Sequence, residues 1–389
     1  MINVTLFSQI LQIVPRDILK KITIQHGSDK HAKGIDTWNH VVNMIFCHLG
    51  KINSLRDISN GMKVAGGNLN HLGVGRAPCK SALSYINANR KWEVFQDFYY
   101  ALLEHLTSVH KFHRKPGIKL KRKIFLLDST TIPLCLKAFD WAKFRKKKGA
   151  VKIHTLLDYD GCLPSYLFVS DGKKHDVKAA REIPLPSGSV VVMDKAYVDF
   201  KWLSVLDSTG VFFVTRAKDN MQYRVVTSHK VKREDKAWLL EVKDVKLTGF
   251  YTQKHYSDLL RLVRIWDEKS QMELTFLTNN LSWTASTVAD LYKARWEIEI
   301  FFKQIKQNLK IKSFIGTSEN AVMIQIWTAM ITMLLLTFLK SKAKFPWHLS
   351  GMITFLRLNI FVKINLWEWL DKPFDKPPEQ SENYQLKFF

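Results

Sequence analysis

The chain has few cysteines, and their positions restrict its chemistry. It contains four in 389 residues, Cys47, Cys79, Cys135 and Cys162, and no two of them form a Cys-x-x-Cys pair. This scatter excludes a disulfide framework and a cysteine-based structural zinc site, and it fits a reducing cytosol. The amino terminus lacks a basic region followed by an apolar run, so no signal peptide is expected. Internal repeats are also missing.

Acidic residues are scarce relative to basic ones. The chain has 35 aspartates and glutamates against 59 lysines and arginines, a net charge of +24. This excess favours a polyanionic partner, and nucleic acid is the usual one. A basic protein without such a partner, or one that meets an anionic membrane, is the alternative. A hydrophobic content of 46% predicts a folded chain and disfavours disorder.

One apolar run is long enough to cross a membrane. Residues Val322 to Leu339 are nearly all apolar. The run is interrupted by Gln325 and by threonines, and it follows a charged helical segment directly. We therefore expect a buried core helix and no membrane partner.

The sequence pattern divides the chain into regions of different predicted secondary structure. Residues 1–110 read as helices, with Pro15 and Ser54 at two helix starts. Their short helices are compatible with a helix-turn-helix, although any small helical bundle would look similar. From Lys123 the pattern changes to short apolar strands mixed with helices, which predicts an α/β fold. Five strands are expected in this part: Ile124–Asp128, Val151–Asp158, Ser165–Ser170, Ser189–Asp194 and Val211–Thr215.

Four further regions are predicted after this helical one. Residues 120–215 form the first part of a mixed five-stranded sheet with flanking helices, and residues 216–277 form a β-rich insertion because their polar and apolar residues alternate. Residues 278–345 return to the core. Residues 346–389 hold a further helix and a polar, proline-rich tail.

Basic residues gather in two runs. Lys111–Lys123 holds seven lysines and arginines in thirteen residues, and Lys143–Lys152 holds six in ten. The second run includes Arg145, Lys146, Lys147 and Lys148 beside a predicted strand. Solvated loops can carry such runs, but in a chain of this charge we expect contacts to a phosphate backbone.

One stretch carries four polar groups at helical spacing. Tyr292, Arg295, Glu299 and Lys306 stand at offsets of 0, 3, 7 and 14 residues. On an α-helix these offsets fall within an arc of about 60°. A solvated helix face with mixed charge would show a similar pattern. However, an apolar stripe beside the polar one places Glu299 at the edge of the core; it consists of Ile298, Phe301, Phe302, Ile305 and Leu309.

Two aspartates each end an apolar strand. Asp128 and Asp194 would lie where the carboxyl ends of strands open to solvent, which is where open α/β sheets bind ligands. A strand-end aspartate alone is often a turn former, but with Glu299 the set has three carboxylates. Such a set can hold two Mg²⁺ ions, which prefer oxygen ligands. The ions would activate a water or a 3′-hydroxyl and stabilise the leaving oxygen.

These segments resemble the three motifs of bacterial DDE transposases. The motifs are Leu127-Asp-Ser-Thr-Thr131, Val192-Met-Asp-Lys-Ala-Tyr197 and Tyr292-x-x-Arg-x-x-x-Glu-x-x-x-x-x-x-Lys306. The third is similar to the Tyr-Arg-Glu-Lys signature of the IS-four family of insertion-sequence transposases. The resemblance covers residues 120 to 340. One departure is Ala196, where relatives commonly have glycine.

The resemblance implies a ribonuclease-H-like catalytic core interrupted by the β-rich insertion, with an all-α, DNA-binding amino-terminal domain. Asp128, Asp194 and Glu299 would be its catalytic, metal-binding triad, whereas Tyr292, Arg295 and Lys306 would hold DNA phosphates. In relatives the insertion supports a hairpin intermediate with a tryptophan stacked on a flipped base. Here Trp238 or Trp266 could take that role, and either could equally be core. His154 and the pair His175-Asp176 stand near the strands, where they could approach the metals or DNA, although a structural role is favoured for each histidine.

The function that the resemblance implies is DNA transposition. The protein would bind element ends, cleave DNA with two Mg²⁺ ions, for which Mn²⁺ can substitute, and join the 3′-hydroxyl ends to target DNA. Its partners would be double-stranded DNA at element ends and target, and a second copy of itself as a homodimer on paired ends. It would lie in the bacterial cytoplasm with the nucleoid. An inactive DNA-binding remnant, or a ribonuclease-H-like nuclease without strand transfer, are the alternatives.

Overall fold

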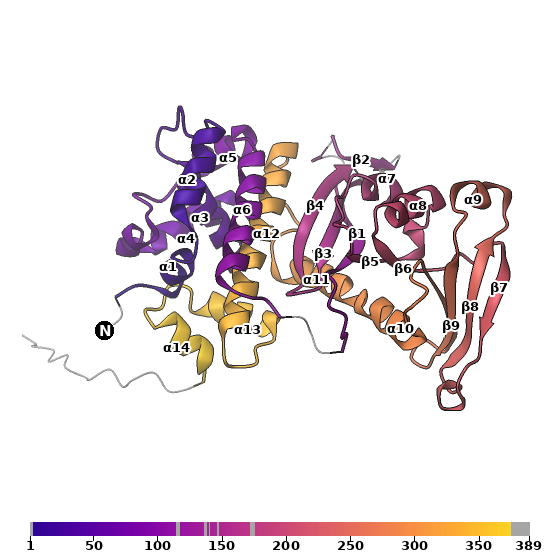
Figure 1. The fold of residues 1–389 in the computed structure, drawn as a ribbon. Coiled ribbons are helices and arrows are strands. Elements are labelled where there is room, and N and C mark those ends of the chain that lie inside the picture. The colour runs from indigo at the N-terminus through magenta and orange to yellow at the C-terminus, as the bar shows by residue number, and fades with distance from the viewer. Residues whose placement is uncertain are drawn as a thin grey trace, which may run out of the picture.

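The computed structural model describes residues 3–113, 117–135, 138–139, 141–145, 148–171 and 176–374. Three parts follow one another across the molecule (Figure 1): a helical unit, a central sheet with helices on it, and a strand-rich end that carries α9. Lys146, Lys147 and His175 lie outside the described residues.

One mixed sheet of ten strands runs through the described part of the chain. The strand order is β2-β3-β1-β5-β6-β10-β9-β8-β7, and β4 pairs with β3. Strands β1, β5 and β6 are parallel neighbours, whereas β3 is antiparallel to β1. The bounds are β1 Ile124–Leu134, β2 Lys143–Arg145, β3 Lys148–Asp158, β4 Leu163–Asp171, β5 Val190–Met193, β6 Phe212–Arg216, β7 Tyr223–His229, β8 Leu239–Leu247, β9 Leu260–Asp267 and β10 Met272–Thr278.

The five strands predicted from the sequence are confirmed as β1, β3, β4, β5 and β6. The segment predicted as a β-rich insertion holds β7, β8, β9 and β10. Its last strand, β10, pairs with β6, and β9, β8 and β7 continue outward from there. Pairing with β10 covers the edge of β6, whose backbone groups would otherwise lack partners. The insertion is therefore a continuation of the central sheet.

Alternating residues of the central strands build a core on each face of the sheet. Ile124 and Leu126 of β1 belong to one buried cluster, and Phe125 and Leu127 belong to the other. This alternation follows from the two-residue repeat of a strand. All four residues of β5 are buried, as is typical of a strand covered on both faces.

Helices cover the two faces of the sheet. Helices α10 (Ala285–Ala294) and α11 (Trp296–Asn308) pack into the first cluster, while α8 (Phe200–Ser208) packs into the second. The short helix α7 (Asp176–Ala180) contacts β1 and β3, and α9 (Phe250–His255) contacts α8.

The helical unit combines both ends of the chain. Helix α12 (Glu319–Lys342) packs on α3, α5 and α6 as well as on α13. Packing therefore groups these helices across the predicted boundaries at residues 110 and 345. The remaining bounds are α1 Leu6–Leu11, α2 Arg16–Gln25, α3 Thr37–Gly50, α4 Leu55–Val64, α5 Lys80–Asn89, α6 Glu93–Val109, α13 Leu349–Leu358 and α14 Leu366–Asp371.

Helix α12 explains the long apolar run. By length and composition it could span a membrane, but 94% of its most apolar window is buried inside the protein. Its Trp327 lies between Tyr99 and Tyr100 of α6, with ring centroids 5.7 Å from each. This burial agrees with the core helix predicted from the sequence.

Candidate active site

The parallel pairing of β1 with β5 brings the two strand-end aspartates together. Leu127 pairs with Met193, so the next residues, Asp128 and Asp194, are neighbours at the carboxyl end of β5. Strand β1 continues beyond Asp128 because β3 still pairs with it as far as Leu134. The two carboxylates therefore come from one continuous strand and from the end of another.

The third motif forms two helices instead of the single one predicted. Helix α10 ends and α11 begins at Arg295. The Arg295 N–H donates to the Tyr292 carbonyl (3.1 Å), and the Ile298 N–H donates to the Arg295 carbonyl (3.2 Å). Such bonds over three residues tighten the backbone locally. The apolar stripe predicted beside Glu299 is buried, so α11 still presents its polar face at the site.

Arg295 and Tyr292 connect the three motifs. Arg295 Nη2 donates to Glu299 Oε1 at 2.6 Å, and its Nη1 lies 3.5 Å from Asp128 Oδ2. The Tyr292 hydroxyl donates to Asp194 Oδ1 at 3.3 Å. The structure thus brings these five predicted site residues into one network.

Lys306 lies farther along α11. Its Nζ donates to the carbonyl of Thr131 on β1 at 3.2 Å. Burial, together with the neighbouring charge of Lys312, lowers the pKa of Lys306. Thr131 is three residues beyond Asp128, so Lys306 extends the cationic side of the site along β1.

The charges of the site are incompletely balanced. Burial raises the pKa of Asp128 to about 6, and the carboxylates of Glu299 and Asp194 push it in the same direction. The Ser129 N–H, which donates to Asp128 Oδ1 at 2.8 Å, and the Arg295 guanidinium oppose this rise. Carboxylates that share a site in this way favour a bound cation.

The donor set fits a hard divalent cation. It consists of carboxylate oxygens from Asp128, Asp194 and Glu299, which suit Mg²⁺ or Mn²⁺ better than softer metals. Among the described residues, no three acidic, histidine or cysteine side chains are close enough together to hold a metal ion as they stand. In this arrangement the Arg295 guanidinium contacts two of the carboxylates, Asp128 and Glu299.

The predicted basic run is described only in part. Arg145 ends β2 and is paired in register with Lys148 of β3. This pairing brings the two backbones together at one edge of the sheet. Lys146 and Lys147 lie outside the described residues, so the predicted phosphate contacts of this run stay a prediction.

Two features beside the site were not among the predicted site residues. Asp176 carries a network of its own next to Asp128, and Trp296, which directly follows Arg295, is 60% exposed. The tryptophans proposed from the sequence, Trp238 and Trp266, are both half-buried. The motif spacing drew attention to Arg295 and Glu299, but it gave no measure of the exposure of Trp296 between them.

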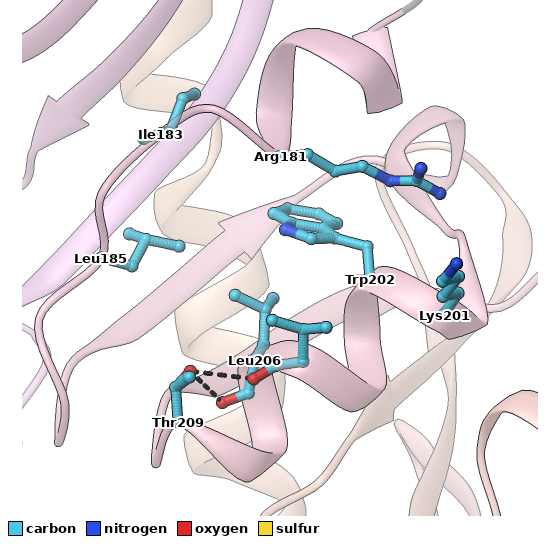
Figure 2. A pocket seen from close by; sticks show the side chains of 8 residues that line it. Arg181, Ile183, Leu185, Lys201, Trp202, Leu206 and Thr209 are labelled. Atoms are coloured by element: carbon cyan, nitrogen blue, oxygen red, sulfur yellow. Dashed lines mark hydrogen bonds between the residues drawn. The ribbon is translucent and has the colours of Figure 1, made fainter.

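Two hollows flank α8. One measures 370 Å³ and is lined by apolar residues together with Thr209, Arg181 and Lys201; the Arg181 side chain extends past the Trp202 ring, and Lys201 lies to one side of that ring (Figure 2). The other measures 470 Å³, lies between α8 and α9, and is also lined by Lys218. Neither hollow contains the three carboxylates.

The comparisons with known proteins identify the family. The model of the Transposase DDE domain matches residues 119–335, more than half of the chain. The chain belongs to the DDE transposases. A second model, the Domain of unknown function (DUF4372), matches residues 3–75.

Named relatives agree with this family. The chain is 35% identical over 263 residues to the putative transposase y4zB of Sinorhizobium fredii, covering 67% of this chain and 71% of the relative. It is 27% identical over 270 residues to the probable transposase for insertion sequence element IS5377 of Geobacillus stearothermophilus (68% and 70%). It is 25% identical over 293 residues to the putative transposase for insertion sequence element IS4SA of Synechocystis (75% and 80%).

The transposase is therefore an enzyme of an insertion sequence that binds DNA, cleaves it and transfers strands. The family also implies that this chemistry depends on a divalent metal. The charge of +24 agrees with DNA as the partner.

Proposed function

We propose that the transposase cleaves element ends at a site formed by Asp128, Asp194 and Glu299, and that these carboxylates hold two Mg²⁺ ions, for which Mn²⁺ can substitute. The observation that carries this proposal is the network in which Arg295 and Tyr292 join all three carboxylates. The raised pKa of Asp128 adds support: burial is its main cause, and the nearby carboxylates of Glu299 and Asp194 contribute to it.

The catalytic core is proposed to be ribonuclease-H-like. Support comes from the strand order β4-β3-β1-β5-β6, in which β1, β5 and β6 run parallel and β3 runs antiparallel to β1. The two aspartates lie on the adjacent strands β1 and β5, in the middle of this order. The spacing of Tyr292, Arg295, Glu299 and Lys306 further supports the IS-four family within the DDE class.

A bound divalent metal would polarise the scissile phosphate and provide an activated water or 3′-hydroxyl at neutral pH. The protein's own residues align the carboxylates for this task. The Ser129 N–H orients Asp128, and the Tyr292 hydroxyl orients Asp194. Helix α11 supplies Glu299 from the opposite side of the site.

Tyr292, Arg295 and Lys306 are proposed to bind DNA phosphates beside the scissile bond. Arg295 Nε is buried and has no hydrogen-bond partner among the described residues. An unpaired buried donor is costly, so a phosphate oxygen that reaches it would be bound favourably. Once metal neutralises the carboxylates, the Arg295 guanidinium can turn from them toward phosphate.

The DNA path is proposed to continue from the Asp194 motif across α8. The larger hollow begins at Val198, four residues beyond Asp194. Three cations line it, Arg181, Lys201 and Lys218, together with one carboxylate, Asp199, which pairs with Arg181. Helix α9 on its far wall exposes Phe250 (89%) and Tyr251 (75%), which offer aromatic faces beside these cations. Cationic grooves with exposed aromatics suit a nucleic-acid backbone and unpaired bases.

The complete reaction is proposed to join the freed 3′-hydroxyl ends to target DNA from a homodimer on paired ends, in the bacterial cytoplasm with the nucleoid. Cutting both ends in step requires two active sites. Light scattering of the protein mixed with end DNA should give the mass of two chains on two ends, whereas the mass of one chain on one end contradicts the dimer.

The test of the active site uses purified protein, Mg²⁺ and a duplex that carries the ends of its own element, taken from the DNA that flanks the reading frame. Glu299→Gln should reduce nicking by about 100-fold or more, because it removes a charged ligand, while DNA affinity persists. Glu297→Gln, on the same helical turn, serves as the matched control and should cut normally. Cleavage by Glu299→Gln at the parental rate would refute the assignment.

The same assay separates the alternatives. A pre-cut end supplied with target DNA should yield a joined product. Cutting without joining would indicate a nuclease, and binding without cutting would indicate an inactive remnant.

A further inference from the structure

Asp176 contacts side chains from three separate segments near the site. Its carboxylate accepts a hydrogen bond from Ser129 Oγ at 2.6 Å and lies 2.7 Å from Lys152 Nζ. The Tyr197 hydroxyl and His154 Nδ1 each lie 3.5 Å from it. Ser129 belongs to β1, Lys152 and His154 to β3, and Tyr197 to the turn after β5.

Two of these contacts lead directly to the strand-end aspartates. Ser129 follows Asp128 in the chain, and its N–H donates to Asp128 Oδ1. Tyr197 ends the short 3-10 helix Lys195–Tyr197, which Asp194 precedes, and its N–H donates to the Asp194 carbonyl at 3.0 Å. Asp176 therefore connects the backbone segments that carry both aspartates, although it contacts neither carboxylate itself.

Most of the network around Asp176 is shielded from water. The side chains of Tyr197 and His154 are each 1% exposed, that of Lys152 is 16% exposed, and that of Asp176 itself is 22% exposed. Charge-assisted hydrogen bonds in such surroundings are strong and restrict geometry. Removing one partner leaves the others without compensation. The network is therefore suited to fixing the position of β1 relative to the turn after β5.

We propose that Asp176 is a positioning residue for DNA cleavage, which holds Asp128 and Asp194 at the separation that metal binding requires by acting through Ser129 and Tyr197. This inference rests on the proposed function of the two aspartates. It assigns Asp176 no contact with DNA, metal or the reacting atoms.

The principal test compares the full-length protein with Asp176→Asn, which preserves shape and removes charge. Nicking of end DNA is measured over a range of Mg²⁺ concentrations, alongside DNA affinity and thermal unfolding. We expect maximal nicking to fall and the half-saturating Mg²⁺ concentration to rise, each by about 10- to 100-fold, as is usual when a residue that orients metal ligands is lost. DNA affinity should be unchanged.

Ser129→Ala provides a smaller perturbation if Asp176→Asn fails to fold. It should reproduce part of the loss, whereas Ser129→Thr, which keeps the hydroxyl, should cut normally. The double variant Ser129→Ala/Asp176→Asn should be no worse than Asp176→Asn, because both changes break the same connection. Additive losses would contradict action through Ser129.

A second control separates positioning from simple charge. Asp176→Asn leaves Lys152 without its partner, and an unpaired cation could repel metal. In the double variant Lys152→Met/Asp176→Asn this charge is removed, and nicking should stay low. Recovery of parental nicking would overturn the positioning role.

The remaining outcomes are also distinguishable. The inference is refuted if Asp176→Asn cuts like the parent at every Mg²⁺ concentration. It is also refuted if the loss of nicking is matched by equal losses of DNA affinity and thermal stability. If the parent itself does not cut, or if Glu299→Gln cuts normally, the proposed function fails instead.

Discussion

At the scale of single residues, Arg295 has two roles that share one position. It is the point where α10 and α11 meet, and it contacts Glu299 and Asp128 with the charge that a cation would otherwise supply. An arginine in this position lowers the repulsion among the carboxylates, so the site can fold before metal arrives. The same charge competes with metal for the carboxylates.

We therefore expect Arg295→Gln to bind metal more tightly and yet cleave more slowly. Removing a positive charge a few ångströms from the carboxylates should lower the half-saturating Mn²⁺ concentration by roughly fivefold or more. Maximal nicking should fall because a phosphate contact is lost. Calorimetry with Mn²⁺ and a nicking assay measure the two effects. Arg264→Gln, whose partner Glu273 lies outside the carboxylate site, is the control, and weaker Mn²⁺ binding by Arg295→Gln contradicts the competition.

His48 should make the helical unit sensitive to acid. It is fully buried between a hydrogen bond to Thr328 Oγ1 (3.0 Å) and one from the Lys310 N–H (3.3 Å). Burial lowers its pKa from 6.5 to about 3. Because the unfolded chain binds this proton more readily, folding stability should be unaffected above pH 6.5 and should fall progressively as the pH drops from there toward 3.

The expected contribution of His48 is up to about 1.4 kcal/mol of unfolding free energy per pH unit. Denaturant unfolding between pH 6 and pH 4 should show a shallower pH dependence for His48→Gln, even though this variant starts less stable. His31→Gln, at an exposed position of the same unit, controls for the loss of an imidazole. An unchanged slope in His48→Gln would contradict the prediction.

At the scale of elements, α8 and α9 form a cationic surface that begins beside Asp194. Lys201 on α8 is exposed and lines both hollows. If this surface contacts the DNA backbone, Lys201→Ala should weaken binding to all sequences alike. The slope of log affinity against log salt should fall by about 0.9, the value for one phosphate contact.

Lys232→Ala is the matched control for Lys201→Ala. Lys232 is also exposed, but it precedes β8, whereas α9 follows β8. Lys232 and α9 therefore lie at opposite ends of that strand. Its replacement should leave the salt slope unchanged. Equal slopes for Lys201→Ala and the parent would exclude α8 from the DNA path.

Elements whose signals are local could be predicted from the sequence. Ser54 caps α4 by accepting from the Asp57 N–H at 3.1 Å, and the strands that end at Asp128 and Asp194 follow apolar runs. The break at Arg295 was not predicted, since a turn with hydrogen bonds over three residues preserves the apolar spacing. Asp176 was not assigned because its partners are distant in sequence, and hydrophobic periodicity carries no information about such pairs.

At the scale of the whole molecule, long-range packing decides what can stand alone. The sheet continues from the catalytic strands into the insertion, and α12 fills the centre of a unit that begins with α1. Neither relation follows from local pattern, since each depends on pairing between distant segments. The predicted regions therefore mark changes in the sequence pattern and not independent folding units.

We expect the fragment 1–110 to fail to fold independently. Helices α3 and α6 bury much of their apolar surface against α12, and its removal would expose that surface. Circular dichroism and light scattering should show an aggregating or loosely packed fragment without a cooperative thermal transition. A monomeric fragment that unfolds cooperatively would contradict the prediction.

The central place of α12 also sets an order of events during synthesis. Helices α3 and α6 leave the ribosome first, but the helix that completes their core follows only after residues 110–318 have been translated. The whole catalytic sheet is therefore made before the helical unit can close. A chain released early, from a truncated message or a stalled ribosome, would lack a finished amino-terminal unit, so only full translation yields a molecule with both of its parts in working order.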